Sequence, residues 1–411
     1  MQTTNDLKQL STHFFAPARS ALLNSDRQRN CPELSDVQWM QMGVTRVLKE
    51  CRSGRGFLQD WAMSQPEEAS VDVSLFFETL KSSLRLALIE DTNTMVARSM
   101  PSHPDGLIDG LEELAKFDIF AGDGHYHSTS THEPLIQGKR RALGHFYTLN
   151  LRTHGLTHLA AADHQDGLKK AEHDMHVLKR MSRAALRQGA AKGRKVLYVW
   201  DCAGIDMRQW FNWKQSAAVY FLSRNKENMK ITYYGEKEFD HDDPINAGVL
   251  SDNLVTNASA GVTFRLIKYK CPNTGTEYEF ISNQMTIRPG VLAWLYMRRW
   301  DIEKTYDTFK NKMNEQKAWA KSKNAKTMQA QFLCLAHNLM VLLQNSISEE
   351  NQIEDQKEIK RAKTRCKAVI EKCKELGSNI SPLYLNPYKR SQFSLKFIRW
   401  LGYHLGQNFF V

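Results

Sequence analysis

The chain has 411 residues, of which 42% are hydrophobic and 25% charged, and its formal net charge is +11. This composition indicates a globular protein of two or three domains, and the absence of repeats or low-complexity tracts excludes a fibrous or repetitive chain. The positive charge favours a polyanionic partner, with nucleic acid as the first candidate.

Several other protein classes lack support in the sequence. No apolar run reaches the roughly 18 to 20 residues that a membrane helix needs, and the N-terminus has no signal-peptide core. The seven cysteines are scattered without a CxxC pair, which favours reduced structural thiols. Neither a P-loop nor a strand–GxGxxG–helix pattern indicates a nucleotide site. We therefore expect a cytoplasmic protein.

The N-terminal region, residues 1–106, is predicted to be helical. The stretches at 35–50 and 71–90 carry apolar residues at spacings of three and four, and the loop-like CRSGRG separates them. The Pro- and Gly-containing PSHPDG at 101–106 predicts a boundary. A short helix at 107–116 should follow it.

The next segment is predicted to alternate between strands and helix. Its elements are strands at 117–123, 144–153 and 155–163, an amphipathic helix at 171–191, and a central strand at 196–201. A meander of three strands followed by a crossover helix and a parallel strand would place the first and last strands side by side. Asp123 and Asp201, which end these two strands, should then be neighbours.

The remainder begins with a β-rich insert from 217 to about 283, where strand-like segments are broken by Asn, Gly, Asp and Pro. A helix is predicted at 289–313 and a second, apolar one at 325–345. The tail from Glu349 has the alternating charges of a solvated helix. It ends in an apolar segment at 391–411 that is suited to docking on another surface.

Four polar side chains of the helix at 289–313 fall within about 60° of one another at 100° per residue. They are Tyr296, Arg299, Glu303 and Lys310. This segment alone favours an ordinary surface ion pair between Arg299 and Glu303. If the helix packs on the sheet, however, the same side chains would bring Glu303 beside Asp123 and Asp201.

Clustered carboxylates have a specific chemical use. They repel one another strongly unless a cation compensates them, and Mg²⁺ favours carboxylate oxygens, waters and substrate phosphates. Paired metal ions can activate a water or a 3′-hydroxyl and stabilise the leaving oxygen of a phosphoryl displacement. The neighbouring Tyr296, Arg299 and Lys310 would then contact phosphates.

The Tyr-x2-Arg-x3-Glu-x6-Lys spacing of these four residues resembles the signature of bacterial insertion-sequence DDE transposases, in the group that includes the transposon-five enzyme. AGDG around Asp123 and DCAG from Asp201 look like the first and second acidic motifs of that family. FLSRNKEN is similar to its strand with a DNA-contacting arginine, here Arg224, and SLFFETLKSSLRL resembles a stretch upstream of its first aspartate. The resemblance covers roughly residues 70–345.

The fold that this resemblance implies is α/β, with a ribonuclease-H-like catalytic core built on a mixed five-stranded sheet. A β-rich insertion interrupts the core, and helical regions flank it. The implied division is an N-terminal DNA-end-binding region at 1–106, the core at 107–224 and 286–347, the insertion at 225–285, and a C-terminal region with a possible dimerisation role at 348–411.

The function that the resemblance implies is DNA transposition in a bacterial, nucleoid-associated setting. The enzyme would bind the terminal inverted repeats of double-stranded DNA, cut the ends through a hairpin and join the 3′-hydroxyl ends to target DNA. Two Mg²⁺ or Mn²⁺ ions would be held by the catalytic residues Asp123, Asp201 and Glu303. A homodimer would act in the synaptic complex, and DNA contacts would come from Tyr296, Arg299, Lys310 and Arg224.

One departure from the family pattern concerns the insertion. Members often use a tryptophan there to stack on a flipped base, but residues 214–293 contain none. Tyr278 or Phe280 could serve instead, because stacking needs an aromatic face rather than an indole. The alternative is that the hairpin step differs.

Competing interpretations remain open at the level of sequence. His125 and His127, with His132 nearby, could be ligands of a metal-dependent hydrolase that does not act on DNA, although the sequence does not identify the remaining ligands. Asp118 is a rival to Asp123 as the first acid, but no glycine follows it. A third possibility is a catalytically silent, DNA-binding relative of the transposases.

Overall fold

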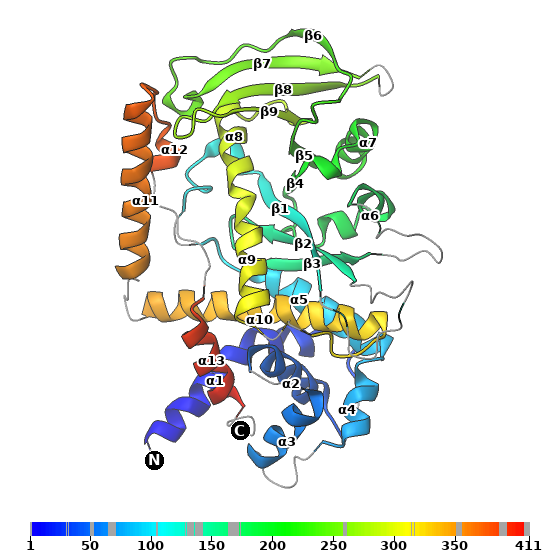
Figure 1. The fold of residues 1–411 in the computed structure, drawn as a ribbon. Helices are drawn as coiled ribbons and strands as arrows, with labels where there is room; N and C mark the ends of the chain where they lie inside the picture. The colour runs from blue at the N-terminus through cyan, green and yellow to red at the C-terminus, as the bar shows by residue number, and fades with distance from the viewer. Residues whose placement is uncertain are drawn as a thin grey trace.

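The computed structural model describes residues 2–406, except for a set of short gaps. The gaps are residues 30, 32, 50–52, 65–70, 104–105, 128, 130–134, 136–142, 163–171, 173, 258–260, 314, 316, 351–355 and 386–392. The described residues form a central sheet with helices on its faces and a helical region at one end (Figure 1).

The helices before the sheet are α1 (Gln2–Leu23), α2 (Asp36–Leu48), α3 (Gly54–Ser64), α4 (Val73–Thr79) and α5 (Ser83–Ser99). The strands are β1 (Phe117–Tyr126), β2 (Gly144–Asn150), β3 (Leu156–Ala161), β4 (Lys195–Trp200), β5 (Val219–Arg224), β6 (Thr232–Glu236), β7 (Val249–Thr256), β8 (Thr263–Lys270) and β9 (Glu277–Ser282). The other helices are α6 (Asp174–Arg180), α7 (Met207–Ala217), α8 (Pro289–Arg298), α9 (Trp300–Asn311), α10 (Lys323–Glu350), α11 (Gln356–Glu375), α12 (Pro382–Leu385) and α13 (Leu395–Leu405).

The strands form one sheet in the order β3-β2-β1-β4-β5-β9-β8-β7-β6. The strands β1, β2 and β3 form an antiparallel meander, and β4 lies parallel to β1, which confirms the predicted neighbourhood of these strands. The expected five-stranded core sheet is not separate from the insertion. Strand β9 pairs with β5, so the four insertion strands extend the same sheet to nine strands.

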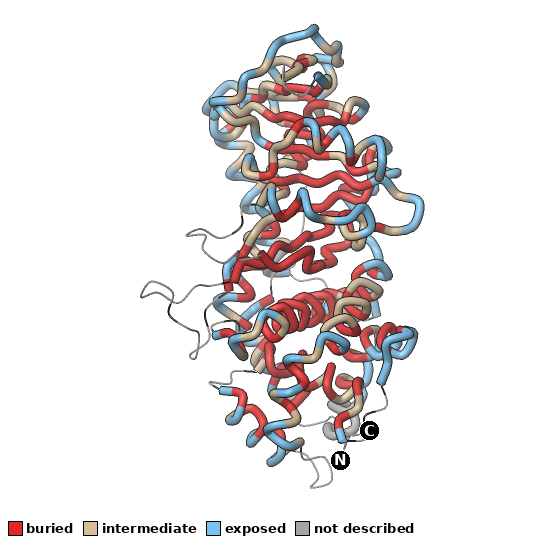
Figure 2. The backbone as a smooth tube through the Cα atoms, turned by 90° about the vertical axis from the view of Figure 1, so that its right-hand side faces the viewer, coloured by how far each residue is buried: buried red, intermediate tan, exposed pale blue. Residues whose placement is uncertain are grey.

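The side chains of each strand alternate between the two faces of the sheet, and each face has its own hydrophobic cluster. Ile119 and Ala121 of β1 belong to the larger cluster, together with residues of α8, α9 and α10, whereas Phe120 belongs to the cluster covered by α6 and α7. Because successive side chains of a strand point to opposite faces, Asp123 shares the face that α9 covers. Figure 2 shows the central strands and α10 as largely buried.

Two predicted helices are shorter in the structure. The expected helix at 107–116 is only a 3-10 turn at Glu112–Leu114, preceded by turns around Gly110. The expected helix at 171–191 ends at Arg180 among the described residues. The Ser182 hydroxyl then accepts a hydrogen bond from the Ala185 N–H (3.1 Å), and this local capping contact begins a separate 3-10 turn.

The expected helix at 289–313 is divided into α8 and α9 at Arg299. Arg299 keeps helical backbone angles, but its N–H donates to the Tyr296 carbonyl (3.1 Å), and the Ile302 N–H donates to the Arg299 carbonyl (3.2 Å). These are three-residue rather than four-residue hydrogen bonds, so the helix tightens locally. The tightening changes the angular positions that a regular helix would give to the residues on its two sides.

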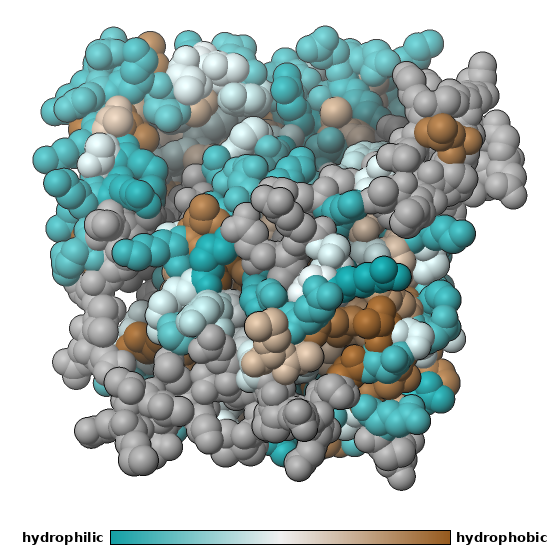
Figure 3. Space-filling model, turned by 60° about the horizontal axis from the view of Figure 1, so that its bottom comes forward, coloured by the Kyte–Doolittle hydropathy of each residue, from teal (hydrophilic) through white to brown (hydrophobic). Residues whose placement is uncertain are grey.

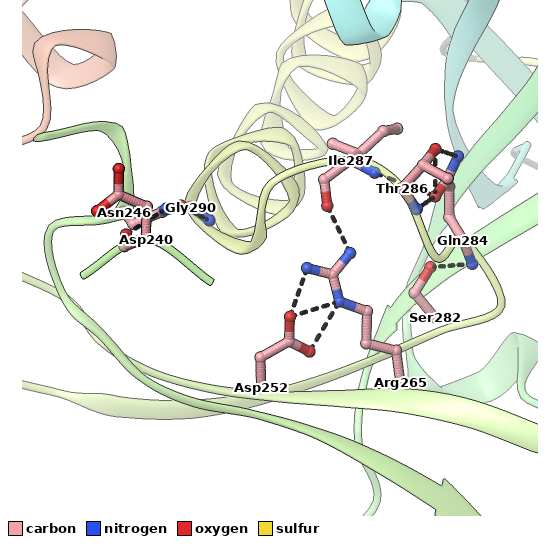
Figure 4. A network of polar contacts seen from close by, with 9 residues as sticks. All are labelled: Asp240, Asn246, Asp252, Arg265, Ser282, Gln284, Thr286, Ile287 and Gly290. Carbon is pink, nitrogen blue, oxygen red and sulfur yellow. Dashed lines mark hydrogen bonds and ion pairs between the residues drawn. The ribbon is translucent and has the colours of Figure 1, made fainter. Parts of the chain in front are cut away.

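Buried polar contacts join the insertion to the start of α8 (Figure 4). Arg265 of β8 makes a two-pronged ion pair with Asp252 of β7 and also donates to the Ile287 carbonyl. The Gly290 N–H donates to the Asn246 side chain (3.1 Å), and a Cβ on Gly290 would lie 2.0 Å from a backbone oxygen. The insertion therefore fixes the position of α8.

The N-terminal helices pack on the core through α10, which lies between them and the sheet (Figure 1). The C-terminal helix α13 docks on α2, with Gly402 against the backbone of Leu48. Viewed toward this end of the molecule, exposed hydrophobic side chains lie in patches among hydrophilic ones (Figure 3). Within the described part of the chain, no helix is long and apolar enough to cross a membrane.

Candidate active site

Two carboxylates of the site come from the neighbouring parallel strands β1 and β4. Ala121 pairs with Val199, and extending this register by two residues places Asp123 beside Asp201 on the same face. Asp201 follows β4 directly and accepts a hydrogen bond from the Ala203 N–H (2.9 Å). Asp123 accepts one from the Gly124 N–H (2.8 Å). Each backbone contact orients one carboxylate oxygen.

The third carboxylate, Glu303, lies on α9 and is linked to β1 through Arg299. The guanidinium of Arg299 contacts Glu303 Oε1 at 2.8 Å and Asp123 Oδ2 at 3.5 Å. Tyr306, one turn further along α9, donates its hydroxyl proton to the Asp123 backbone carbonyl (2.9 Å). The strand and the helix are thus joined on both sides of the first carboxylate.

The pKa of Asp123 is raised to about 7. Burial is the main cause, the Arg299 cation opposes it, and the negative charges of Asp201 and Glu303 add to it. One arginine therefore does not compensate the three acidic groups. Three converging carboxylates fit a divalent cation, whose preferred ligands are carboxylate oxygens.

Tyr296 and Arg299 lie together beside the acids. Burial raises the pKa of the Tyr296 phenol, and the Arg299 cation lowers it. The guanidinium carbon of Arg299 lies 5.9 Å from the centre of the Tyr296 ring, which in turn packs 4.9 Å from the ring of Phe280. The kink at Arg299 thus leaves both residues near the carboxylates.

Comparison with protein families finds that residues 99–339 match the family described as Transposase DDE domain. The matched residues make up more than half of the chain. The chain belongs to the DDE transposase family. The matched residues run from the end of α5 into α10 and include Asp123, Asp201 and Glu303. The mixed α/β fold is consistent with a ribonuclease-H-like DDE domain, and enzymes of this family generally use divalent metal ions. No curated protein matches the chain.

The transposase also has an aromatic pocket of about 270 Å³ next to Arg299, and one of its lining residues, Trp300, is not among the residues predicted from the sequence. Tyr278 and Phe280 line it from the insertion, and Tyr296 and Arg299 line it from the end of α8. Trp300, the first residue of α9, is 49% exposed and lines the same pocket. Trp300 lies outside the insertion, where the family pattern places the stacking tryptophan.

The two remaining predicted DNA contacts are placed at the surface. Lys310 is exposed in the last turn of α9. Arg224, at the end of β5, is exposed, with its guanidinium carbon 5.7 Å from the centre of the Tyr278 ring. The role of both residues in this transposase stays a prediction.

The rival residues occupy different environments. Asp118 accepts a hydrogen bond from the Ala191 N–H (2.8 Å) and points to the opposite face of the sheet from Asp123, so it is a structural carboxylate. His125 and His127 are buried and meet Glu315, which follows α9. His132 lies outside the described residues.

Proposed function

We propose that this transposase acts on double-stranded DNA by cut-and-paste transposition and belongs to the insertion-sequence group that includes the transposon-five enzyme. The observation that carries the proposal is the convergence of Asp123, Asp201 and Glu303 from two strands and a helix. The Tyr296–Arg299–Glu303–Lys310 spacing supports the group assignment.

The carboxylates define where the chemistry takes place. Two Mg²⁺ or Mn²⁺ ions held by Asp123, Asp201 and Glu303 would activate a water or a 3′-hydroxyl and stabilise the leaving oxygen. The chain orients these ligands through the Gly124 and Ala203 N–H groups. Such hydrogen bonds fix the acids before substrate binds.

Arg299 is placed to exchange partners during binding. Its guanidinium contacts Asp123 and Glu303 and is mostly buried. A scissile phosphate presents the same geometry of paired oxygens as a carboxylate, so Arg299 can turn to it once cations compensate the acids. Tyr296 would donate a hydrogen bond to the same phosphate, and Lys310 would contact a phosphate further along the strand.

The aromatic pocket supports a hairpin step with a displaced base. Trp300, Tyr278 and Phe280 present aromatic faces in the pocket beside Arg299. Stacking on such a face is sequence-tolerant and stabilises an unstacked base by roughly 1–3 kcal/mol. Trp300 would thus take the place of the insertion tryptophan that the chain lacks. Arg224, which lies over the Tyr278 ring, would contact the backbone of the DNA strand that carries the displaced base.

The outer regions would recognise DNA and the second subunit. We assign recognition of the terminal inverted repeats to residues 1–106 and synaptic dimerisation to residues 348–411, with the core at 107–224 and 286–347 and the insertion at 225–285. These assignments are supported by the family analogy and by the net charge of +11. Part of α13 is buried against α2 of its own chain, whereas Trp400 and Tyr403 on the same helix are exposed, so a dimer contact at α13 would use these exposed side chains.

The test uses the purified full chain and DNA that carries the inverted repeats flanking its gene. Asp201→Ala and Glu303→Ala should abolish metal-dependent cleavage and preserve end binding, because they remove metal ligands and leave the DNA-binding surface in place. Asp307→Ala, an exposed acid of the same helix, is the control and should cleave normally.

Unchanged cleavage in both variants would overturn the proposed mechanism. Failure of the unaltered chain to cleave, with end binding intact, would instead identify a catalytically silent relative. If the chain shows neither end binding nor cleavage but hydrolyses other substrates with metal bound at His125 and His127, the hydrolase alternative holds.

A further inference from the structure

A second set of metal-type ligands lies behind the carboxylates. His125 lies on β1, on the same face as Asp123, and His127 directly follows the strand. Glu315 reaches both histidines from the segment after α9. Glu315 Oε1 lies 2.7 Å from His125 Nε2 and 3.2 Å from His127 Nε2. All three side chains are at most 3% exposed, and one ligand atom from each lies within 4.8 Å of the other two.

Ordinary hydrogen bonds do not satisfy this group. His127 Nε2 faces both Glu315 Oε1 and, at 2.5 Å, the Tyr147 hydroxyl, although one ring nitrogen has a single proton or a single lone pair to offer. Within the described residues, Glu315 Oε2 and His127 Nδ1 have no hydrogen-bond partner. Buried polar atoms without partners are costly. The crowding of Glu315 Oε1, the two histidine Nε2 atoms and the Tyr147 hydroxyl therefore points to a missing common partner.

We propose that His125, His127 and Glu315 hold a structural Zn²⁺ ion, separate from the divalent-metal site at the carboxylates. Zn²⁺ binds imidazole nitrogen and carboxylate oxygen at about 2.0–2.2 Å in a tetrahedron, which separates its ligand atoms by about 3.3 Å. The separations of 2.7 and 3.2 Å from Glu315 Oε1 are both shorter than this value. The ligand atoms would therefore move apart by at most about 0.6 Å to admit the ion. The fourth position falls to the Tyr147 hydroxyl or a water.

The chemistry and burial of the two sites differ. Three carboxylates suit Mg²⁺, whereas two imidazoles and one carboxylate suit zinc. Structural zinc sites are closed, while catalytic ones keep an open position. Because His125, His127 and Glu315 are almost fully buried, a substrate has no access to them, and the site is structural rather than hydrolytic.

The position of the proposed zinc gives it a mechanical role. It would join β1, two residues after Asp123, to the segment that follows the helix bearing Glu303. The His125 ring also stacks on Tyr306 at 4.6 Å, and Tyr306 donates to the Asp123 carbonyl. The zinc would therefore help to hold Asp123 and Glu303 in their relative positions, in addition to Arg299.

The first experiment measures zinc in the unaltered full chain, purified without an affinity tag and dialysed into Mg²⁺ buffer. Elemental analysis should find about one zinc per chain. After the zinc is stripped with a chelator, Co²⁺ should bind and give the visible absorption bands of a tetrahedral nitrogen–oxygen site. A chain that holds no zinc, and that binds neither Zn²⁺ nor Co²⁺ after stripping, would overturn the proposal and leave a hydrogen-bonded histidine cluster.

Variants locate the ion. His127→Ala and the nearly isosteric Glu315→Gln should each lower zinc content at least about tenfold, the loss expected when a ligand is removed. His337→Ala, which removes a buried histidine bonded to the His154 carbonyl, is the matched control and should retain zinc. Zinc that persists in Glu315→Gln and in His127→Ala would contradict the assigned ligands. Asp201→Ala should lose cleavage but keep zinc, which separates this site from the proposed function.

Discussion

The charge of Asp123 depends on its neighbours, and this gives the first prediction. Its folded-state pKa, about 7, lies above the usual 3.8, so its contribution to stability is complete below pH 4 and is lost as the pH rises through 7. Metal-free Asp123→Asn should thus be more stable than the unaltered chain at pH 8, by up to ~4 kcal/mol, with a smaller difference at pH 5. Thermal unfolding in chelator at both pH values measures this.

The same experiment contains its own controls. Mg²⁺ should raise the unfolding temperature of the unaltered chain at pH 8 more than that of Asp123→Asn, because the variant offers one fewer anionic ligand. Asp307→Asn, at an exposed carboxylate of α9, should behave like the unaltered chain. A variant that is less stable than the unaltered chain at pH 8 would show that the negative charge of Asp123 stabilises the metal-free fold.

The proposed phosphate contacts are tested through the salt dependence of end binding. Arg299→Ala and Lys310→Ala should each flatten the log–log slope of affinity against salt by roughly one unit, since each removes one phosphate contact. Arg299→Lys should keep the slope, because it retains the charge. Lys372→Ala, on α11 and paired with Glu375, is the control. An unchanged slope in either of the first two variants removes that residue from the phosphate contacts.

The role of Trp300 is separable from the role of the acids. Trp300→Ala should slow hairpin formation by roughly 5- to 150-fold, the loss of one base stack, while first-strand nicking stays within about twofold. Trp300→Phe should retain much of the hairpin rate because it keeps an aromatic face. Product analysis on denaturing gels distinguishes the two steps. Equal slowing of nicking and hairpin formation would assign Trp300 to general positioning of α9.

At the scale of elements, the buried pair in the insertion sets the position of α8. Arg265→Met should destabilise the fold by about 3–5 kcal/mol, because Asp252 would remain buried without a counter-charge. Adding Asp252→Leu should restore much of the loss. Lys268 lies on the same strand as Arg265 and makes an exposed ion pair with Glu279 of β9. Lys268→Met should therefore lower the free energy of unfolding by at most about 1 kcal/mol. Thermal unfolding compares the three, and equal losses in both single variants would show that burial does not decide the effect.

The order of the core strands was predictable, and the kink between α8 and α9 was not. The two acidic strands carry a clear apolar pattern, and the rules of strand connection then place Asp123 beside Asp201. At Arg299, no proline or glycine marks the change from α8 to α9. The insertion contacts the start of α8 at Gly290, and β1 contacts α9 through Tyr306. These contacts join residues far apart in sequence, and no local pattern predicts them.

The ligand set around His125 illustrates the same limit at longer range. The pair of histidines is visible in the sequence, but Glu315 lies 190 residues away in a segment without periodicity. Only the packing of α9 on β1 brings it there. In the same way, the residue pattern of the insertion predicted its strands. Its union with the core sheet depends on the pairing of β9 with β5, which no local pattern predicts.

At the scale of the whole molecule, α10 connects the regions that the sequence divides. Asn338 of α10 donates to Asn93 of α5 and to the Leu156 carbonyl of β3 (both 2.9 Å). The Leu156 N–H in turn donates to Asn338 (2.7 Å). One side chain therefore ties an N-terminal helix to the edge of the sheet.

The closeness of α2 and α10 has a consequence for synthesis. A Cβ on Gly43 would lie 2.2 Å from the ring of Phe332, and Trp39 packs on the same ring. Phe332 leaves the ribosome about 290 residues after Gly43, so the face of α2 that packs on α10 is uncovered during most of translation. The nascent N-terminal helices should consequently depend on holdase chaperones until α10 has emerged, and a messenger truncated before α10 should yield insoluble product.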